Sequence, residues 1–412
     1  MKIAYFSHYF VPEIGAPSAR IYDLACEWTR AKHQVEIVTC FPNHPTGAIY
    51  PGYKSQFYLL EKMAGINIHR HWTYVTPNKG VTRKTIGHFS YLPSARAFSD
   101  RHLESPDVAI GTSPTFFAAV AAARFAHRRR IPFVMEVRDL WPAIFAELGV
   151  IKNRTVISLL ERWEMSLYRR ASRIVVVTAA FRKNLIDRGV PLEKVFTIPN
   201  GADIDFWTPQ SRLNDLRRRL GLEDRFVVLY IGAHGISHAL SRVLDCAAKL
   251  SSLADVHFLF VGEGAEKDKL MERSRQMRLA NVTFHDAVDR LAVREFYALA
   301  DVCVVPLRDI PLFDTFVPSK MFEMMAMARP IVGSVRGEAA EILRRAGVIV
   351  VEPENSEALA SAITDLYKRD EQARQVMGAQ ARDFVVAHYS RRALSANYID
   401  VMKTAIASYA TA

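Results

Sequence analysis

Three residues near position 320 place a hydroxyl, an ammonium and a carboxylate within about one turn of an expected helix. Ser319, Lys320 and Glu323 lie in the stretch Pro318–Glu323, and Ser319 is expected to be the N-cap. A lysine in the first turn opposes the helix macrodipole unless an anion binds there, and a helix N-terminus with a lysine suits phosphate. The Glu323 carboxylate can accept two neighbouring sugar hydroxyls. Phosphate plus ribose indicates a nucleotide; the alternative is a capped helix with a surface Lys–Glu pair.

This stretch resembles the donor-site helix of family 4 glycosyltransferases of the GT-B type. The resemblance is carried by Pro-Ser-Lys-x-x-Glu-x-Met-Ala at 318–326 and by the Pro-Ile-Val strand that follows. Many members have two glutamates here, eight positions apart. In this chain the second is Glu323, whereas the first position is Thr315, with Asp314 beside it. The Pro-Ser-Lys form resembles the subgroup of bacterial O-antigen and capsule enzymes similar to N-acetylfucosaminyltransferases.

A glycine loop near the N-terminus forms a turn between a strand and a helix that can accommodate phosphate. Gly15 allows close backbone approach to a ligand, and Ser18 or Arg20 can contact it. The family has a glycine loop at this point, facing the donor. It usually shows two adjacent glycines, whereas this chain has Gly15-Ala16.

A second glycine loop, Gly232–His238, follows an expected strand, and its backbone N–H groups can bind phosphate. The family often has Arg and Lys where this chain has Ala233 and His238. This departure assigns the neutralisation of phosphate charge to Lys320, with a contribution from His234. Gly262, in a turn between a strand and a helix that is common to many folds, is a further candidate for nucleotide binding. The resemblance also implies that the backbone from Asp286 to Val288 frames the nucleobase.

Two loops of the first half are candidates for the acceptor side. Asn43 and His44 lie in a Pro-rich loop after a strand, where ligand contact and a rigid connector are equally expected. Arg138 and Asp139 follow another buried strand and should point into the crevice at the sheet end. Asp139 is expected to be a base or to orient the acceptor; the alternative is an N-cap of the next helix. The Asp-Leu-Trp-Pro sequence at 139–142 is typical of the same subgroup.

Positive charge is concentrated in one segment. The net charge is +11, and Ile66–Arg130 holds ten Lys/Arg against three Asp/Glu. Within it, Lys79–Arg101 is expected to be a basic amphipathic helix over the acceptor side or a membrane surface. A basic face attracts anionic membrane or phosphorylated ligands, and no nucleic-acid motif is seen. The alternative is a solvated positive face, or a helix packed on the core.

Strands alternate with helices through both halves, which predicts an α/β fold with mostly parallel sheets. The resemblance implies GT-B: two Rossmann-like domains facing a central cleft, with a last helix returning to the first. We expect an acceptor-side domain at 1–199, a donor domain at 200–388 and the returning helix at 389–412. No apolar run reaches the length of a transmembrane helix, and the four scattered cysteines suit a reducing cytosol.

The predicted activity is a retaining, metal-independent hexosyl or N-acetylhexosaminyl transfer, with retention implied by the resemblance alone. The expected donor is a UDP-sugar, such as a UDP-N-acetyl deoxyhexose, and no cofactor is expected. The expected acceptor is an undecaprenyl-diphosphate-linked glycan of lipopolysaccharide or capsule synthesis, at the inner face of the cytoplasmic membrane. The alternatives are a family 4 transferase with a small soluble acceptor, a UDP-sugar epimerase of the same fold, and a non-catalytic nucleotide-sugar-binding partner.

Overall fold

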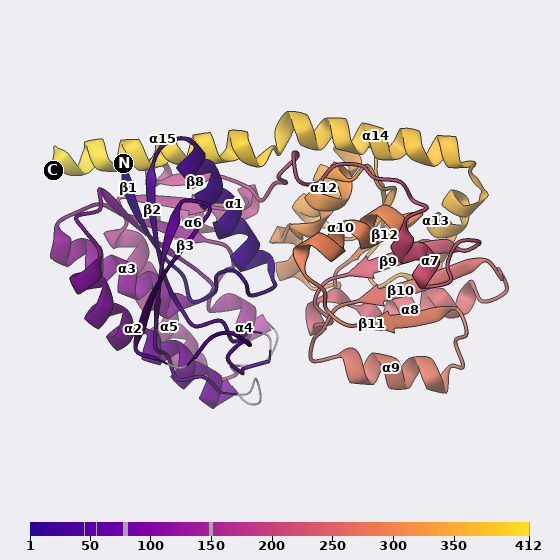
Figure 1. Ribbon diagram of the computed structural model, residues 1–412, viewed down its shortest axis with the longest axis horizontal. Helices are drawn as coiled ribbons and strands as arrows, with labels where there is room; N and C mark the ends of the chain where they lie inside the picture. The colour runs from indigo at the N-terminus through magenta and orange to yellow at the C-terminus, as the bar shows by residue number, and fades with distance from the viewer. Residues whose placement is uncertain (45, 55, 77–80, 148–150, 412) are drawn as a thin grey trace. The chain divides into compact units, whose positions relative to one another are not determined.

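The computed structural model of the chain describes residues 1–44, 46–54, 56–76, 81–147 and 151–411, with the backbone alone at 81–84 and 145 (Figure 1). The chain divides into two compact units, Met1–Pro199 with Arg391–Ala412 and Asn200–Ser390. Each unit has a sheet of parallel strands covered by helices, so the predicted α/β fold class is confirmed.

Within the described residues, the first unit carries an eight-stranded sheet in the order β3-β4-β2-β1-β5-β6-β7-β8. β3 runs antiparallel to β4, and the other neighbouring strands are parallel. The central strands are apolar and buried because helices cover both faces. The strands are β1 (Lys2–Phe6), β2 (Gln34–Cys40), β3 (Tyr58–Met63), β4 (Ile66–His71), β5 (Val108–Thr112), β6 (Phe133–Val137), β7 (Arg173–Val176) and β8 (Val195–Thr197).

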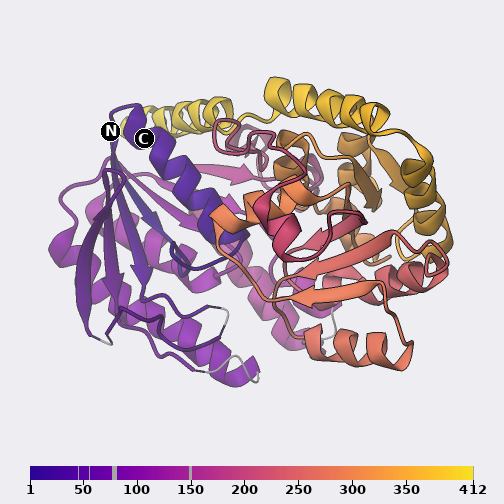
Figure 2. The same cartoon turned by 45° about the vertical axis from the view of Figure 1, so that its right-hand side comes forward.

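The last helix, α15, packs on α1 in the first unit. Figures 1 and 2 show it in yellow beside the indigo start of the chain. Trp28 of α1 and Tyr398 of α15 are fully buried, with ring centroids 5.2 Å apart. The helical elements are α1 (Ala16–Arg30), α2 (Val81–His102), α3 (Phe116–Arg129), α4 (Ala143–Glu147), α5 (Arg154–Arg170), α6 (Ala179–Asp187), the 3₁₀ turn η1 (Leu192–Lys194) and α15 (Arg391–Ala410).

The described part of the second unit has a six-stranded sheet in the order β11-β10-β9-β12-β13-β14, with every neighbouring pair parallel. The strand β9 is buried at all six positions, as a sheet covered on both faces requires. The strands are β9 (Phe226–Ile231), β10 (Val256–Val261), β11 (Val282–His285), β12 (Val302–Pro306), β13 (Ile331–Ser334) and β14 (Ile349–Val351).

Helices α8 and α13 pack together on the core of this second sheet. Helices α11 and α14 form another packed pair, in which Gly378 of α14 permits close approach to the Ala328 carbonyl. The helical elements are α7 (Asp215–Arg219), η2 (Ile236–His238), α8 (Leu240–Lys249), α9 (Lys267–Gln276), α10 (Arg290–Leu299), η3 (Pro311–Thr315), α11 (Lys320–Ala326), α12 (Gly337–Arg345), α13 (Ser356–Lys368) and α14 (Glu371–His388).

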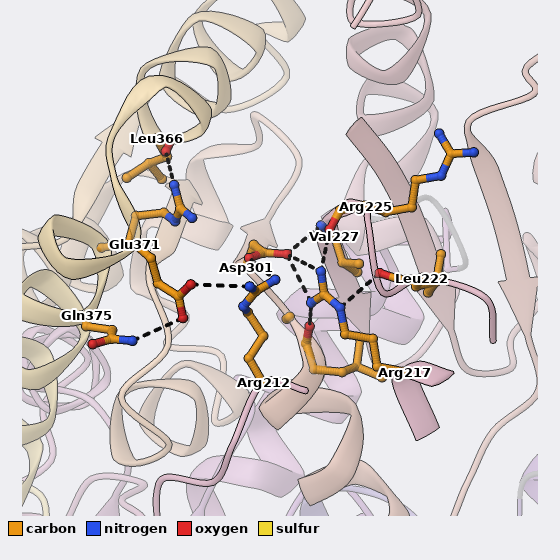
Figure 3. Close-up of polar contacts among 12 residues, drawn as sticks. Arg212, Arg217, Leu222, Arg225, Val227, Asp301, Leu366, Glu371 and Gln375 are labelled. Carbon is orange, nitrogen blue, oxygen red and sulfur yellow. Dashed lines mark hydrogen bonds and ion pairs between the residues drawn. The ribbon is translucent and has the colours of Figure 1, made fainter. Parts of the chain in front are cut away.

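A buried ionic network ties the amino ends of β9 and β12 together (Figure 3). Asp301 is 3% exposed, and its Oδ2 accepts hydrogen bonds from Arg217 at 3.1 Å and from the Val227 N–H at 2.8 Å. Its Oδ1 lies 3.1 Å from Arg212, which also pairs with Glu371 at 3.3 Å. One carboxylate therefore ties α7 and the segment before it to the amino ends of these two strands.

The sequence analysis did not anticipate β3 or α6. β3 is an edge strand whose polar Glu61-Lys62 pair hides its alternation, and it pairs only through β4. Helix α2 begins at Val81, so Lys79 of the expected basic helix lies outside the described residues, as do the side chains of Arg83 and Lys84. Across the described chain, no helix combines the length and hydropathy needed to span a membrane.

Candidate active site

Lys320 lies at the carboxyl end of β9, beside the Gly232 loop. Its Nζ is 3.9 Å from the centroid of the Tyr230 ring and 3.4 Å from the Ile231 carbonyl oxygen, to which it donates. A Cβ added to Gly232 would stand 3.1 Å from this Nζ, so glycine leaves room for the ammonium. Desolvation lowers the pKa of Lys320 to about 7. A desolvated ammonium beside a loop with positive φ at Gly232 is a strong site for an anion.

Glu323 stands one turn beyond Lys320, and Tyr297 of α10 orients it. The Tyr297 hydroxyl donates to Glu323 Oε2 at 3.0 Å. Burial, with Glu323 beside it, raises the pKa of Tyr297, so the phenol keeps its proton. Tyr297 could not be identified from the sequence, because it lies on a different helix from Glu323 and matches no motif. The arrangement presents a fixed carboxylate next to the cation.

The expected N-cap hydrogen bond of Ser319 is not formed. Ser319 has helical dihedrals, φ −58° and ψ −33°, and its side chain makes no capping hydrogen bond. Ser319 is the N-cap residue of α11, as predicted, but a capping side chain needs an extended backbone to reach the N–H groups that follow. Thr315, at the first glutamate position of the family, ends η3, and its Oγ1 donates to the Leu312 carbonyl at 2.6 Å.

The loops after β9 and β10 lie against each other through their glycines. A Cβ on Gly262 would fall 1.9 Å from the Gly232 carbonyl oxygen, and one on Gly264 would fall 2.4 Å from the His234 carbonyl oxygen. Gly262 and Gly264 also have φ of +141° and +159°. Only glycine fits both the close approach and this backbone conformation. The two loops therefore form one layer beside Lys320.

Lys267 joins the loop after β10 to the loop after β11. Its Nζ donates to Glu263 and to Asp286, each at 2.6 Å. These contacts lower the pKa of Asp286 and raise that of Lys267. The Asp286 side chain is thus bound to protein, and it is the backbone of this loop, up to the partly buried Val288, that can face a nucleobase.

The expectation that His234 shares the neutralisation of phosphate charge is not supported. Its ring is fully buried, with centroids 5.8 Å from Tyr230 and 6.2 Å from Phe284. Burial lowers its pKa to about 4, and it lowers that of His238 to about 3. Both imidazoles are therefore neutral near pH 7. Of the two residues that the sequence analysis assigned to neutralising phosphate charge, Lys320 is therefore the one that can carry a positive charge beside the Gly232 loop.

In the first unit, Asp139 lies at the carboxyl end of β6. It is partly buried, and desolvation raises the pKa of its carboxyl group to about 6. The Ser113 hydroxyl holds this turn: it donates to the Asp139 carbonyl at 3.3 Å and accepts from the Arg138 N–H at 2.9 Å. The next helix begins only at Ala143, so Asp139 is not its N-cap. A carboxyl group with this pKa suits proton transfer near neutral pH.

Arg138 is 9% exposed, and its Nε and Nη1 have no hydrogen-bond partner among the described residues. Burial lowers its pKa, whereas the nearby Glu136 carboxylate acts in the opposite direction. Buried polar atoms in native proteins are normally paired. These two donors at the sheet end are therefore suited to an anionic or polar ligand group.

Arg20 has a structural role instead of the expected ligand contact. It is 1% exposed, and its Nε donates to Glu136 at 3.0 Å. Its other nitrogens donate to the carbonyls of Pro199 and Ile198 at 2.9 and 3.0 Å. Its guanidinium thus fixes α1 to β6 and to the end of the first segment of this unit.

The other predicted residues of this loop differ from each other in exposure. Gly15 is exposed, with φ +153°, and immediately precedes α1. Ser18, in the first turn of the helix, is 2% exposed. Gly15 can therefore meet a ligand, whereas the Ser18 side chain is enclosed by protein.

Glu13 organises the loop that carries Asn43 and His44. Its Oε1 accepts from their N–H groups at 2.8 and 2.9 Å, and its Oε2 accepts from the Phe10 N–H at 3.1 Å. Burial raises the pKa of Glu13 to about 7. The His44 ring lies 5.0 Å from that of Tyr9. The sequence reasoning missed Glu13, because the contact joins two loops about 30 residues apart, at neighbouring strand ends.

The segment Ile66–Arg130 does not form one basic face. Arg70 is fully buried and pairs with Glu61. Arg124 and Arg128–Arg130 lie at the end of α3, which leads to the amino end of β6. Among the described side chains, the charge concentration in the sequence is therefore divided between the interior of the sheet and its amino edge.

Among the described residues, no group of three or more His, Cys, Asp or Glu side chains is placed to hold a metal ion. The chain contains an Asp-x-Asp pair at Asp203 and Asp205. Asp203 Oδ1 accepts from the N–H groups of Asp205 and Phe206, both at 3.1 Å, which forms a local turn.

Comparison with known proteins finds a matching family in each half of the chain. Residues 15–201 match the family described as "Glycosyl transferase 4-like domain", and residues 225–369 match "Glycosyl transferases group 1". The solved structure of Anabaena HepE in complex with UDP and glucose has a TM-score of 0.73, with 18% identity over 98% of this chain and 99% of that one. At this identity the likeness concerns the fold.

Two curated relatives extend the comparison. Alpha-galactosylglucosyldiacylglycerol synthase of Streptococcus pneumoniae is 30% identical over 42% of this chain and 46% of the relative, so the chain spans about half its length. A GDP-mannose-dependent alpha-mannosyltransferase of Mycobacterium tuberculosis is 23% identical over 74% of this chain and 72% of the relative. With a matching domain in each half, the chain belongs to the GT-B glycosyltransferases of family 4.

Proposed function

We propose that the protein transfers a sugar from a nucleotide sugar to an acceptor hydroxyl, with the nucleotide held by the second unit. The observation that carries this proposal is the Lys320–Glu323 pair. Its ammonium is desolvated beside the Gly232 loop, and its carboxylate is oriented by Tyr297 at 3.0 Å. Phosphate would bind at the ammonium and ribose hydroxyls at the carboxylate.

The chemistry follows from where charge develops. As the glycosidic bond to the diphosphate breaks, negative charge grows on the leaving oxygens. The Lys320 ammonium then stabilises the transition state more than the ground state. The acceptor hydroxyl must lose a proton, and the Asp139 carboxylate is the proposed base or orienting group. Retention of configuration is what the family resemblance implies, and neither a metal ion nor a cofactor is required in this scheme.

The proposed donor is a UDP-sugar, with an N-acetylated deoxyhexose as the first candidate. The proposed acceptor is a lipid-linked glycan of bacterial surface-polysaccharide synthesis, reached at the inner face of the cytoplasmic membrane. A relative named for a diacylglycerol glycolipid and another named for teichuronic acid biosynthesis support a lipid or polysaccharide acceptor. The GDP-mannose relative makes GDP the main competitor of UDP.

Calorimetric titration with UDP, GDP and ADP tests the nucleotide directly. We expect micromolar binding of UDP and much weaker binding of the other two. A preference for GDP would support the proposed transferase activity but would make the donor a GDP-sugar instead of a UDP-sugar. Failure to bind any of the three at millimolar concentration would contradict the donor site and favour a protein that does not act on nucleotide sugars.

Replacing Asp139 with asparagine is expected to lower turnover by about 10²–10⁴-fold. The pKa of the carboxyl is raised to about 6, so the wild-type activity should fall as the pH falls through 6, where the carboxylate takes up its proton. The variant should lose this limb of the pH–rate profile while UDP affinity stays the same. Wild-type turnover in folded Asp139→Asn would remove Asp139 from the mechanism.

A further inference from the structure

We propose that the first unit docks on an anionic lipid bilayer by inserting an apolar rim at the carboxyl edge of its sheet. This inference rests on the proposed function for its purpose, which is to bring a lipid-linked acceptor to Asp139. It names the apolar surface that would meet the lipid, which lies partly within the segment Ile66–Arg130. The rim comprises Trp72, Tyr74, Ile86, Phe89, Val156 and Leu159.

Each residue of the rim exposes a large apolar side chain. Phe89 is 54% exposed and Leu159 is 65% exposed, and the other four members are also exposed. Single exposed apolar residues are ordinary, but a contiguous group marks an interaction site. What matters is therefore whether these six residues adjoin one another.

Aromatic contacts connect the two helices that carry most of the rim. Phe89 of α2 lies 5.5 Å from Phe117 of α3, and Phe117 lies 6.0 Å from Trp163 of α5, measured between ring centroids. Trp163 is one turn beyond Leu159, on the same face of α5. Helix α3 packs against both α2 and α5 (Figure 1). Phe89 of α2 and Trp163 of α5 thus both pack against Phe117 of α3.

The segment that follows β4 contributes the remaining members, Trp72 and Tyr74. The Tyr74 N–H donates to the Ser90 hydroxyl of α2 at 2.8 Å. A Cβ on Gly87 would stand 2.8 Å from the Tyr74 carbonyl oxygen, so this segment lies close against the helix. The Tyr74 backbone therefore lies against the part of α2 that carries Ile86 and Phe89, and the rim runs from the end of β4 across α2 to α5.

The rim adjoins the proposed acceptor residues. Phe116, next to Phe117 in α3, stacks on Trp141 with ring centroids 4.2 Å apart. Trp141 is two residues from Asp139, and the Trp141 N–H donates to the Asp139 carbonyl at 3.0 Å. A bilayer at the rim would therefore place a lipid-linked glycan on the edge of the sheet where Asp139 lies.

The charges around the rim favour an anionic bilayer as its occupant. Lys152, Arg154 and Arg162 are exposed on or just before α5, with the exposed Glu161 among them. Apolar and aromatic side chains flanked by Lys and Arg are the composition of surfaces that lie in the interface of anionic membranes.

Flotation of the full-length protein with vesicles of phosphatidylglycerol and phosphatidylethanolamine tests this docking. We expect wild-type protein to float, and much of the binding to persist from about 0.15 M to about 0.5 M NaCl, because inserted apolar groups are not screened. The double variant Phe89→Ser/Leu159→Ser should lose at least about tenfold in partitioning. Leu192→Ser is the matched control: it is 55% exposed in the same unit, just before the amino end of β8, and should float as wild type.

UDP titration of the same samples separates this inference from the proposed function. Unchanged UDP affinity with lost flotation in the double variant supports the rim. Equal flotation of the double variant and wild type overturns it, as does binding that salt abolishes completely. If wild type does not float but forms a dimer in solution, and the double variant is a monomer, the rim is the interface with a second copy. That result would also overturn the proposal. If wild type does not bind UDP, the donor site is contradicted, but the flotation result remains a valid test of the rim.

Discussion

Replacing Lys320 with alanine is expected to weaken UDP binding by about 10- to 100-fold and to lower turnover at least as much. A hydrogen bond to a charged group contributes about 1.5–3 kcal/mol, which corresponds to this range. The effect should be large because His234 and His238, which stand on the adjoining loop, are neutral near pH 7. Desolvation is the largest cause of these lowered pKa values and persists when the lysine is lost, so the two imidazoles do not replace its charge.

The measurement is calorimetric titration of wild type and Lys320→Ala with UDP, UMP and uridine. The loss should grow with the number of phosphates and vanish for uridine, because the base and ribose contacts remain. Arg336→Gln is a suitable control, since Arg336 lies in the same unit but is held by Asp309 and Glu352. Equal losses for uridine and UDP would show that Lys320 supports the fold of the site and does not bind phosphate.

The same titration should depend on pH in a defined direction. Desolvation lowers the pKa of Lys320 to about 7 in the nucleotide-free protein. A bound diphosphate favours the ammonium and raises this pKa, so binding takes up a proton above pH 7. UDP affinity should therefore fall by up to about tenfold per pH unit above 7, and it should lose this dependence in Lys320→Ala. A UDP affinity that is constant from pH 6 to about 9 would contradict the prediction that Lys320 must be protonated to bind the diphosphate.

The sequence predicted those parts of the fold that local patterns determine. The apolar run Phe226–Ile231 before Gly232 predicts a strand, and β9 has these bounds. The segment Arg154–Arg170 reads as a long helix with charges on one face, and α5 has these bounds, with Asn153 capping it by accepting from the Thr155 and Val156 N–H groups. Such elements carry both their periodicity and their ends in the sequence.

The functional contacts that were missed join residues distant along the chain. Tyr297 reaches Glu323 from another helix, and Glu13 reaches Asn43 from the loop after a neighbouring strand. His234 was expected to carry charge, but the aromatic side chains that bury it come from separate strands. The protonation state of His234 and the hydrogen bonds made by Tyr297 and Glu13 depend on this packing. Residue types and spacing alone could therefore not predict them.

Removing the Asp301 carboxylate is expected to produce the largest loss of stability in the second unit. The side chain is 2% exposed and binds Arg217, which is itself fully buried (Figure 3). Asp301→Ala would leave a buried guanidinium without its counter-charge and the Val227 N–H without an acceptor. Breaking a buried pair in this way costs about 3–5 kcal/mol. Thermal unfolding should then shift down by roughly 2–4 °C per kcal/mol.

A matched control exists in the same unit. Asp245 also pairs with two arginines, Arg242 and Arg273, but its side chain is 18% exposed and its partners are about half exposed. Asp245→Ala should therefore cost less than about 1 kcal/mol. Equal shifts in the melting temperature for the two variants would contradict the network's role.

If Asp301→Ala does not fold, Asp301→Asn keeps an oxygen for the Val227 N–H and removes only the charge, so a smaller shift is expected. The double variant Arg217→Met/Asp301→Asn separates the charge from the packing. Because the uncompensated charge is the main cost of losing Asp301, the double variant should be more stable than the sum of the two single losses predicts. Strict additivity would show that the two residues act separately. The strands β9 and β12 begin at this pair, and β9 ends beside Lys320, so a coupled pair here also fixes the strand that positions the ammonium.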